Sequence, residues 1–250
     1  MAAYSPSEYL FDHLVIIVRD CLSELSQKFI HQGFQLTPMA HHNLGSSNRL
    51  IMLDTAYIEL LGWIKGETPK RAEIANQEIG LDAIVFRTDD AQRCYEQLKK
   101  SGFSVSPVQN LTRQAEFEGN AVLVEFKTVR FIEQPVPGLR IYFCEHVTPE
   151  YVWQAQWLKH PNKISYLRDI HIVTQNIQQI SNQFRSLLSL QLHDFIINEK
   201  IIQLNLQNIN IYFHQSADPN SKTSISCIAL SKSIHDPVDL NIDQQFFNHF

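Results

Sequence analysis

The hydrophobic positions of this chain form short runs and helical patterns that follow one another in a fixed order. A buried strand is expected at Leu14–Val18, because five consecutive apolar residues bounded by polar ones are typical of a strand. Leu22, Leu25 and Phe29 then recur at helical spacing, and Gly33 stands where a helix commonly ends. Two further strands are expected at Arg49–Leu53 and Tyr57–Trp63.

The same order recurs 69 residues later, where Gly33–Pro38 (GFQLTP) returns as Gly102–Pro107 (GFSVSP). A repeat at a fixed offset indicates tandem structural modules. Three further pairs keep the offset, namely Val15 and Ile84, Ile17 and Phe86, and Asp20 and Asp89. The second copy predicts a strand at Ala83–Phe86, a helix carrying Cys94, Tyr95 and Leu98, and strands at Ala121–Phe126 and Leu139–Cys144.

A third, degenerate copy begins near Leu167. Its strand at Asp169–Thr174 and helix at Ile177–Leu188 precede further strands at Phe195–Ile197, Ile201–Leu206, Ile209–Phe213 and Ser224–Leu230. We therefore expect an α+β fold of tandem βαβββ modules. The expected boundaries are a first module at 8–64, a second at 80–146, a connector at 147–166, and a partial third module with a C-terminal strand at 167–250.

Composition narrows the class of protein. With 44% hydrophobic residues, 19% charged residues and a net charge of -5, the chain can bury a core and carries no basic stripe for nucleic acid. The first residues do not resemble a signal peptide, and the apolar runs are too short to cross a membrane. Four widely spaced cysteines favour reduced thiols and a cytoplasmic location. Phosphate-binding and nucleophile-elbow motifs are absent, which argues against a kinase, a nucleotide dehydrogenase or a serine hydrolase.

Several segments together resemble the vicinal oxygen chelate superfamily, and most closely its glyoxalase-like branch. They are Phe11–Ile16 (FDHLVI), Gly33–Pro38, His42–Leu50 (HNLGSSNRL), Tyr57–Leu60 (YIEL), Thr148–Trp153 (TPEYVW) and His160–Asn162 (HPN). The resemblance implies paired modules whose curled mixed sheets form a cup. It also implies a divalent metal at the base of the cup, held by the first and last strands of two modules, that chelates two neighbouring substrate oxygens.

On this resemblance the metal ligands of the first module are His13 and Glu59, and the offset adds Asp82 from the second. These side chains suit zinc, nickel, iron or manganese. Tyr142 falls where a carboxylate is expected, although a shift of one residue would bring in Glu145 instead. Three alternatives stay open here: a metal site, a polar cup without metal, and a purely structural role for these residues.

Other polar residues are candidates for substrate contact or proton transfer. His42 and Glu59 are candidate catalytic groups, and a polar loop offers Asn48 and Arg49 as donors to a substrate carboxylate or carbonyl. The same loop is equally well explained as a turn. Further candidate substrate contacts are Tyr142, Glu145, His146 and His160. The connector's Trp153 and Trp157 are expected either to pack on one face of a helix or to wall the cup.

Two main functions follow from the resemblance. One is a metal-dependent lyase, isomerase or dioxygenase that acts on a small substrate with vicinal oxygens. The other is a metal-free protein that binds or sequesters a small molecule, which the aromatic Tyr142 favours. A role in assembly is a third alternative, and a homodimer fits the habit of the family.

Overall fold

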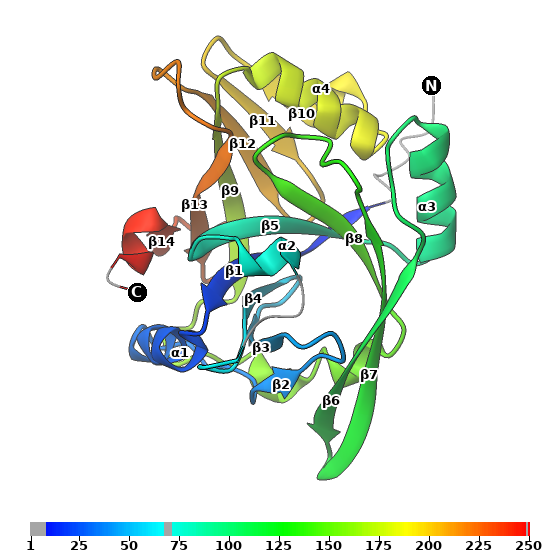
Figure 1. Cartoon of the computed structure of the whole chain (residues 1–250). Helices are drawn as coiled ribbons and strands as arrows, with labels where there is room; N and C mark the ends of the chain where they lie inside the picture. The colour runs from blue at the N-terminus through cyan, green and yellow to red at the C-terminus, as the bar shows by residue number, and fades with distance from the viewer. Residues whose placement is uncertain (1–8, 68–71, 249) are drawn as a thin grey trace.

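The computed structural model describes residues 9–67, 72–248 and 250, and it contains two curled sheets with a few helices (Figure 1). The expected α+β fold of tandem modules with curled mixed sheets and a cup is confirmed. The larger sheet has eight strands in the order β2-β3-β4-β1-β5-β8-β7-β6, and the smaller has six in the order β10-β11-β12-β9-β13-β14.

The first two modules share the larger sheet. The first contains β1 (Leu10–Arg19), α1 (Leu22–His31), β2 (Ala40–His41), β3 (Ser47–Met52) and β4 (Tyr57–Gly62), followed by the short helix α2 (Ala72–Ala75). The second contains β5 (Gly80–Arg87), α3 (Ala91–Lys100), β6 (Gln109–Phe117), β7 (Asn120–Arg130) and β8 (Arg140–His146). Residue 8, the expected start of the first module, lies outside the described residues.

The repeated glycines have a common physical cause. Gly33 and Gly102 each follow the residue that caps the C-terminus of α1 or α3, and they adopt φ angles of +82° and +87°, a conformation that other residues rarely adopt. In both copies the next residue, Phe34 or Phe103, donates its backbone N–H to a carbonyl five residues back in the helix. The 69-residue offset therefore marks a shared helix ending. It does not hold in the first strands, since Val15 and Ile17 face the cup whereas Ile84 and Phe86 pack in the main core. It also fails later in the module, because the β6–β7 hairpin is much longer than β2–β3.

Strand pairing curls the larger sheet into the cup. At its centre β1 pairs antiparallel with β5, while β4 and β8 add in parallel on either side. The two edges then approach each other, because His42 forms a β-bridge with Arg113 of β6 and the Asn43 N–H donates to the Thr112 carbonyl. The inner face of β1 thus looks into a nearly closed space, whereas Leu14 and Ile16 pack outward against the main core.

The rest of the chain forms the smaller sheet and its cover. It contains β9 (Tyr166–Thr174), α4 (Ile177–Leu187), β10 (Phe195–Ile197), β11 (Ile201–Asn205), β12 (Asn210–Gln215), β13 (Ser224–Ser231) and β14 (Leu240–Asp243). Helix α4 packs on β11 and β12 (Figure 1). The buried Asn208 ties this part to the cup by bonding both the N–H and the carbonyl of Phe11.

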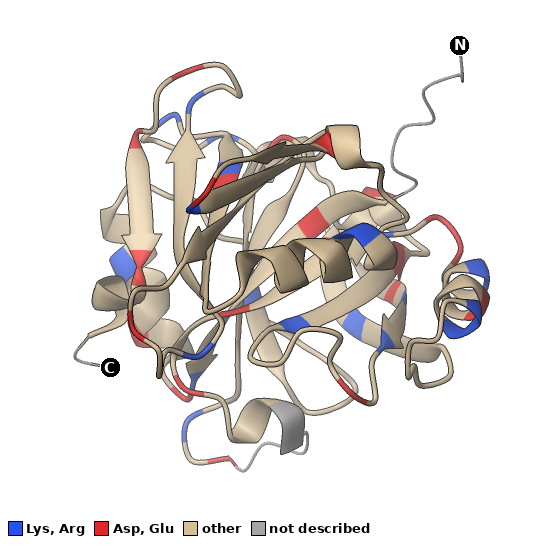
Figure 2. Cartoon of the chain, turned by 90° about the horizontal axis from the view of Figure 1, so that it is seen from above, with Lys and Arg blue, Asp and Glu red and all other residues tan. Residues whose placement is uncertain are grey.

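The connector crosses below the cup as two single 3-10 turns, Pro149–Tyr151 and Ala155–Trp157, rather than one helix. Acidic and basic residues are interspersed along the chain, as the colours in Figure 2 show. Of the helices in the described ranges, none has the length and apolar character to cross a membrane.

Candidate functional site

A bulge at the start of β1 turns two neighbouring polar residues toward the cup. The pairing of β1 with β5 skips Asp12, since Phe11 lies opposite Phe86 and His13 opposite Val85. Asp12 is fully buried and its Oδ2 lies 2.7 Å from Nδ1 of His13. The tautomer that fits this contact carries its proton on Nδ1, so the Nε2 lone pair of His13 faces the cup.

Glu59 of β4 faces the same space. Its Oε2 lies 3.6 Å from Nε2 of His13, and its Oε1 accepts a 2.7 Å hydrogen bond from Nδ2 of Asn48 on β3. Both carboxylate and imidazole are almost completely buried. The Oδ1 atom of Asn48 is buried and has no hydrogen-bond partner among the described residues, which is uncommon in a folded protein. His13 and Glu59 therefore line a cavity in which one hydrogen-bond acceptor, Oδ1 of Asn48, is not used by the described residues.

Tyr142 of β8 completes this cluster from the second module. Its hydroxyl lies 3.2 Å from Nε2 of His13, on whose other side the ring of Tyr57 stacks with centroids 4.4 Å apart. Burial raises the pKa of Tyr142, and the negative charge of Glu59 raises it further. The phenol consequently keeps its proton and can donate it in a hydrogen bond.

Arg113 of β6 brings a positive charge into the cavity. The residue is 7% exposed, and in the described part of the chain no hydrogen bond or ion pair reaches its guanidinium group. The guanidinium group makes a cation–π contact with the ring of Phe126, whose centroid is 5.9 Å away. Burial lowers the pKa of Arg113, and the charge of Glu59 partly offsets this effect. A buried cation without a partner is costly, so the site is suited to an anionic ligand.

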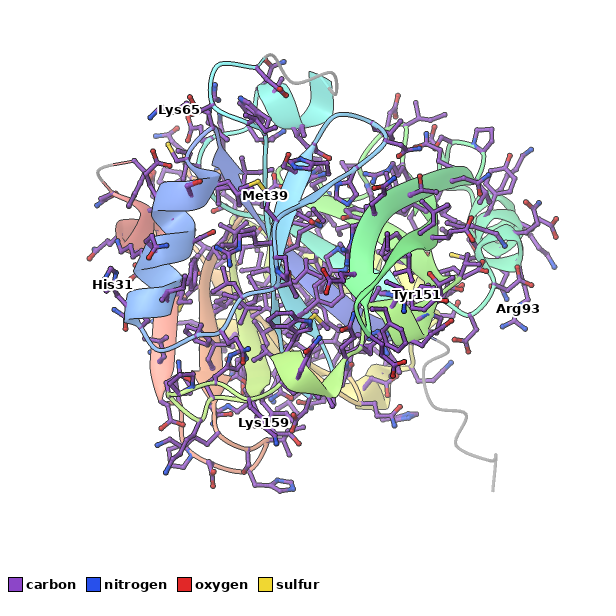
Figure 3. The ribbon with its side chains drawn as sticks, turned by 90° about the horizontal axis from the view of Figure 1, so that it is seen from below. His31, Met39, Lys65, Arg93, Tyr151 and Lys159 are labelled. Carbon is purple, nitrogen blue, oxygen red and sulfur yellow. The ribbon has the colours of Figure 1, made fainter. Side chains whose placement is uncertain are left out.

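The cavity has a volume of about 30 Å³, room for about one water molecule or ion, and it shares His42 and Arg113 with a larger outer cleft. His42 is held by Ser46, whose Oγ lies 2.9 Å from its Nδ1. Met39 and Tyr151, both labelled in Figure 3, line the outer cleft as well. A small molecule entering from the cleft would pass His42 and Arg113 before it reached His13.

A second set of candidate ligands adjoins the first. Asp12, Cys144 and His146 have ligand atoms within 4.8 Å of one another, and no other group of three such residues in the described ranges is as close. Nε2 of His146 lies 2.9 Å from Asp12, while its buried Nδ1 has no hydrogen-bond partner within the described part of the chain. Burial raises the pKa of the Cys144 thiol, and Asp12 adds to this effect.

The charge of Asp12 is already well compensated in this corner. Its Oδ1 accepts a 2.6 Å hydrogen bond from Nε of Arg87, whose guanidinium lies over the ring of Trp153. Burial alone would raise the pKa of Asp12, but His146 and His13 hold it well below its ordinary value. A cation bound here would sit beside Arg87, so we regard Asp12 as the orienting partner of His13.

Two acidic residues expected near the metal lie elsewhere. Asp82 pairs with Arg140, whose Nε donates to it over 2.6 Å, and it does not line the cavity. The carboxylate of Glu145 accepts hydrogen bonds from the N–H of Ala91, at the start of α3, and from Lys127. Each carboxylate thus has a partner of its own outside the cluster around His13.

Arg49 and His160 also lie outside the cavity. Arg49 donates to the Thr37 carbonyl on the other face of β3. His160 accepts the N–H of Gln35 and donates to the Met52 carbonyl, so it joins two loops. Of the other expected residues, His42, Asn48, Glu59 and Tyr142 gather around His13, whereas His146 lies in the adjoining group with Asp12 and Cys144.

Sequence reasoning gave no role to Asp12 or Arg113. Asp12 directly precedes a candidate ligand within the FDHLVI segment, which was an available signal. Arg113 is the one buried residue of β6, a strand without apolar alternation, so nothing in the pattern singled it out.

Comparisons with known proteins agree with this architecture. The model of the glyoxalase-like domain family matches residues 11–188. No curated protein matches the chain. A hypothetical protein from Staphylococcus aureus superimposes with a TM-score of 0.71 at 13% identity, covering 89% of this chain and 90% of that one.

Two further solved structures share the fold. A mutant 4-hydroxymandelate synthase from Streptomyces coelicolor gives a TM-score of 0.50 at 10% identity, covering 89% of this chain and 64% of its own. A fusion of a xylose isomerase-like TIM barrel with 4-hydroxyphenylpyruvate dioxygenase gives 0.54 at 13% identity, covering 91% of this chain and 38% of its own. The chain therefore spans less than two thirds of either protein. The family match covers most of its length, and the chain belongs to the glyoxalase-like domain family of the vicinal oxygen chelate superfamily.

Proposed function

We propose that the cup is the active site of a divalent-metal-dependent enzyme that acts on a small anionic substrate with two neighbouring oxygens. The observation that carries this proposal is the buried pair of His13 Nε2 and Glu59 Oε2, 3.6 Å apart at the base of a cavity. The reaction would be of the lyase, isomerase or dioxygenase kind that the family uses.

The residues present fit a metal at this point. Imidazole and carboxylate ligands bind zinc at roughly 2.0–2.2 Å, which separates two ligand atoms in tetrahedral geometry by about 3.4 Å. The observed separation of 3.6 Å is close to this value. Asp12 on the far nitrogen of His13 is the partner that metal-bound histidines usually have, and Asn48 orients Glu59 in the same way. Zinc, nickel, iron and manganese all suit these two donors.

A bound divalent ion would polarise the neighbouring oxygens of a substrate. The chain's own residues would do the rest. Arg113 would bind the negative charge of the substrate, because its guanidinium has no other partner in the described residues. The hydroxyl of Tyr142 would donate a hydrogen bond to a substrate oxygen beside His13. His42 at the entrance would exchange protons with the substrate, and Glu59 is a second candidate base.

A metal-free protein that binds or sequesters small molecules is the second candidate. Two observations favour it: Tyr142 stands beside His13 where a third charged ligand would serve a metal, and Asp82 is neutralised by Arg140. In that case Arg113 and the aromatic walls would still bind a small anion, and His13 with Asp12 would be a hydrogen-bonding pair only.

Metal content of tag-free protein separates the two functions. The protein would be stripped with chelator, dialysed against Zn, Ni, Fe(II) or Mn, desalted and analysed for each element. We expect the variants His13→Ala and Glu59→Ala each to lose one bound ion per chain, while the exposed controls His31→Ala and Glu199→Ala keep it. If both cup variants retain the metal content of the parent, the enzyme proposal fails. Oxalate, a small dianion with neighbouring oxygens, would then be tested for binding to metal-free protein.

The cellular setting is also part of the proposal. The four cysteines are all free in the structure, which fits the reducing cytoplasm. A homodimer is the assembly we propose to test, by light scattering of the purified chain.

A further inference from the structure

The third module repeats the arrangement around His13 at matching positions of its own strands. In the first module β1 and β4 run in parallel with His13 opposite Tyr57, and Glu59 lies two residues further along β4. In the third module β9 and β12 run in parallel with His171 opposite Tyr212, and His214 lies two residues further along β12. His171, Tyr212 and His214 therefore correspond to His13, Tyr57 and Glu59.

The side chains repeat the geometry as well as the positions. The ring of His13 stacks on Tyr57 with centroids 4.4 Å apart and planes inclined by 14°. The ring of His171 stacks on Tyr212 with centroids 4.9 Å apart and planes also inclined by 14°. Stacking fixes the orientation of each histidine. In the third module it directs Nδ1 of His171 to within 2.9 Å of Nε2 of His214.

We propose that His171 and His214 form a second metal site, which binds a borderline divalent cation such as Zn, Ni or Cu through two imidazole nitrogens. This inference does not depend on the metal proposed for the cup. Two nitrogens at about 2.0–2.1 Å from one ion in tetrahedral geometry lie about 3.4 Å apart. The observed pair, 2.9 Å apart, would therefore need to separate by about 0.5 Å to admit the ion.

The surroundings favour a cation that keeps water ligands. His171, Tyr212 and His214 are each partly exposed, on the face of the sheet opposite Ile170, Ile172 and Phe213 of the main core. Imidazole nitrogens are natural ligands of these metals, and the open face leaves room for water or a further ligand.

The test is the zinc content of tag-free protein after equilibrium dialysis and desalting, with thermal unfolding to confirm that each variant folds. His171→Ala and His214→Ala should each lose one zinc ion per chain relative to the parent. The exposed His235→Ala serves as the matched control and should lose none. Unchanged zinc in either of the two variants would overturn the proposal, because a two-ligand site needs both histidines.

A spectroscopic measurement removes dependence on those variants. In the His13→Ala/Glu59→Ala background, one equivalent of Cu(II) should give an electron paramagnetic resonance spectrum with hyperfine structure from two nitrogen ligands. A spectrum with one nitrogen or none would overturn the proposal. The two metal proposals can be refuted independently. If zinc is lost when His171 is changed but not when His13 is changed, the second site is supported and the metal in the cup is refuted.

Discussion

The change Asp12→Asn tests whether the buried carboxylate acts through His13. Asp12 contacts His13, His146 and Arg87 within 2.6–2.9 Å and is fully buried. The amide has nearly the same shape but no charge, and it offers one acceptor oxygen instead of two. The Nδ1–H of His13 and the Nε–H of Arg87 then compete for that oxygen, so the tautomer and the orientation of the His13 ring are no longer fixed.

The expected loss can be stated in numbers. Removing the outer partner of a metal-bound histidine typically costs about 10–100-fold in metal affinity. That corresponds to about 1.4–2.7 kcal/mol. Because Arg87 and His146 also lose a charged partner, thermal stability should fall as well. Stability alone cannot therefore establish the role of Asp12.

The assay is calorimetric titration of zinc into tag-free protein in a His171→Ala background, so that only the cup is measured. Asp169→Asn is the matched control, because Asp169 is 2% exposed and is bonded to Arg168 and Asn210 in the third module. It should lose stability and keep the parent's affinity for zinc. The reasoning is refuted if Asp12→Asn and Asp169→Asn lose stability alike and both bind zinc as tightly as the parent.

Three further changes test other parts of the account. Arg113→Met should weaken oxalate binding by about 10–100-fold, because a charged hydrogen bond of about 1.5–3 kcal/mol is lost. The melting temperature should stay the same or rise, because the variant no longer buries a cation that lacks an ion-pair partner among the described residues. A lower melting temperature with unchanged oxalate affinity would contradict this prediction. Asp82→Asn should lower the free energy of unfolding in urea by about 3–5 kcal/mol, because buried Arg140 loses its charged partner, and the metal content should not change. Loss of metal from a folded variant would instead make Asp82 a ligand. Burial lowers the pKa of His160, so folding favours its neutral form. Stability should therefore fall as the pH drops below about 6.5, where the unfolded chain takes up a proton. In His160→Gln the stability from urea unfolding should change less between about pH 5 and 7, and an unchanged slope would argue against this.

Much of the fold could be predicted because hydrophobic patterns report local burial. The strand Phe195–Ile197 matched its prediction, and Ile177–Leu188 was one residue longer than α4. Strand β6 was not predicted because only one of its residues is buried, so its sequence needs no apolar alternation. The single helix considered for Trp153 and Trp157 is replaced by two short turns around Pro149 and Gln154.

The candidate site was only partly accessible to sequence reasoning. His13, Glu59 and Tyr142 could be expected to share a face, because the first and last strands of each module are neighbours in the sheet. Arg113 lies in the β6–β7 hairpin. The residues that it contacts depend on how that hairpin curves, and the curvature depends on the whole sheet. The 69-residue offset selected Asp82, but the residues of β5 that face the cup are Ala83 and Val85, and Asp82 pairs with Arg140.

The central claim is that His13 and Glu59 hold a metal ion. A crystal soaked in zinc and measured on both sides of the zinc absorption edge tests it most directly. We predict an anomalous peak at about 2.0–2.2 Å from both His13 Nε2 and a Glu59 carboxylate oxygen. The claim is contradicted by a crystal that shows no peak between these two residues, and equally by a peak held instead by Asp12, Cys144 and His146.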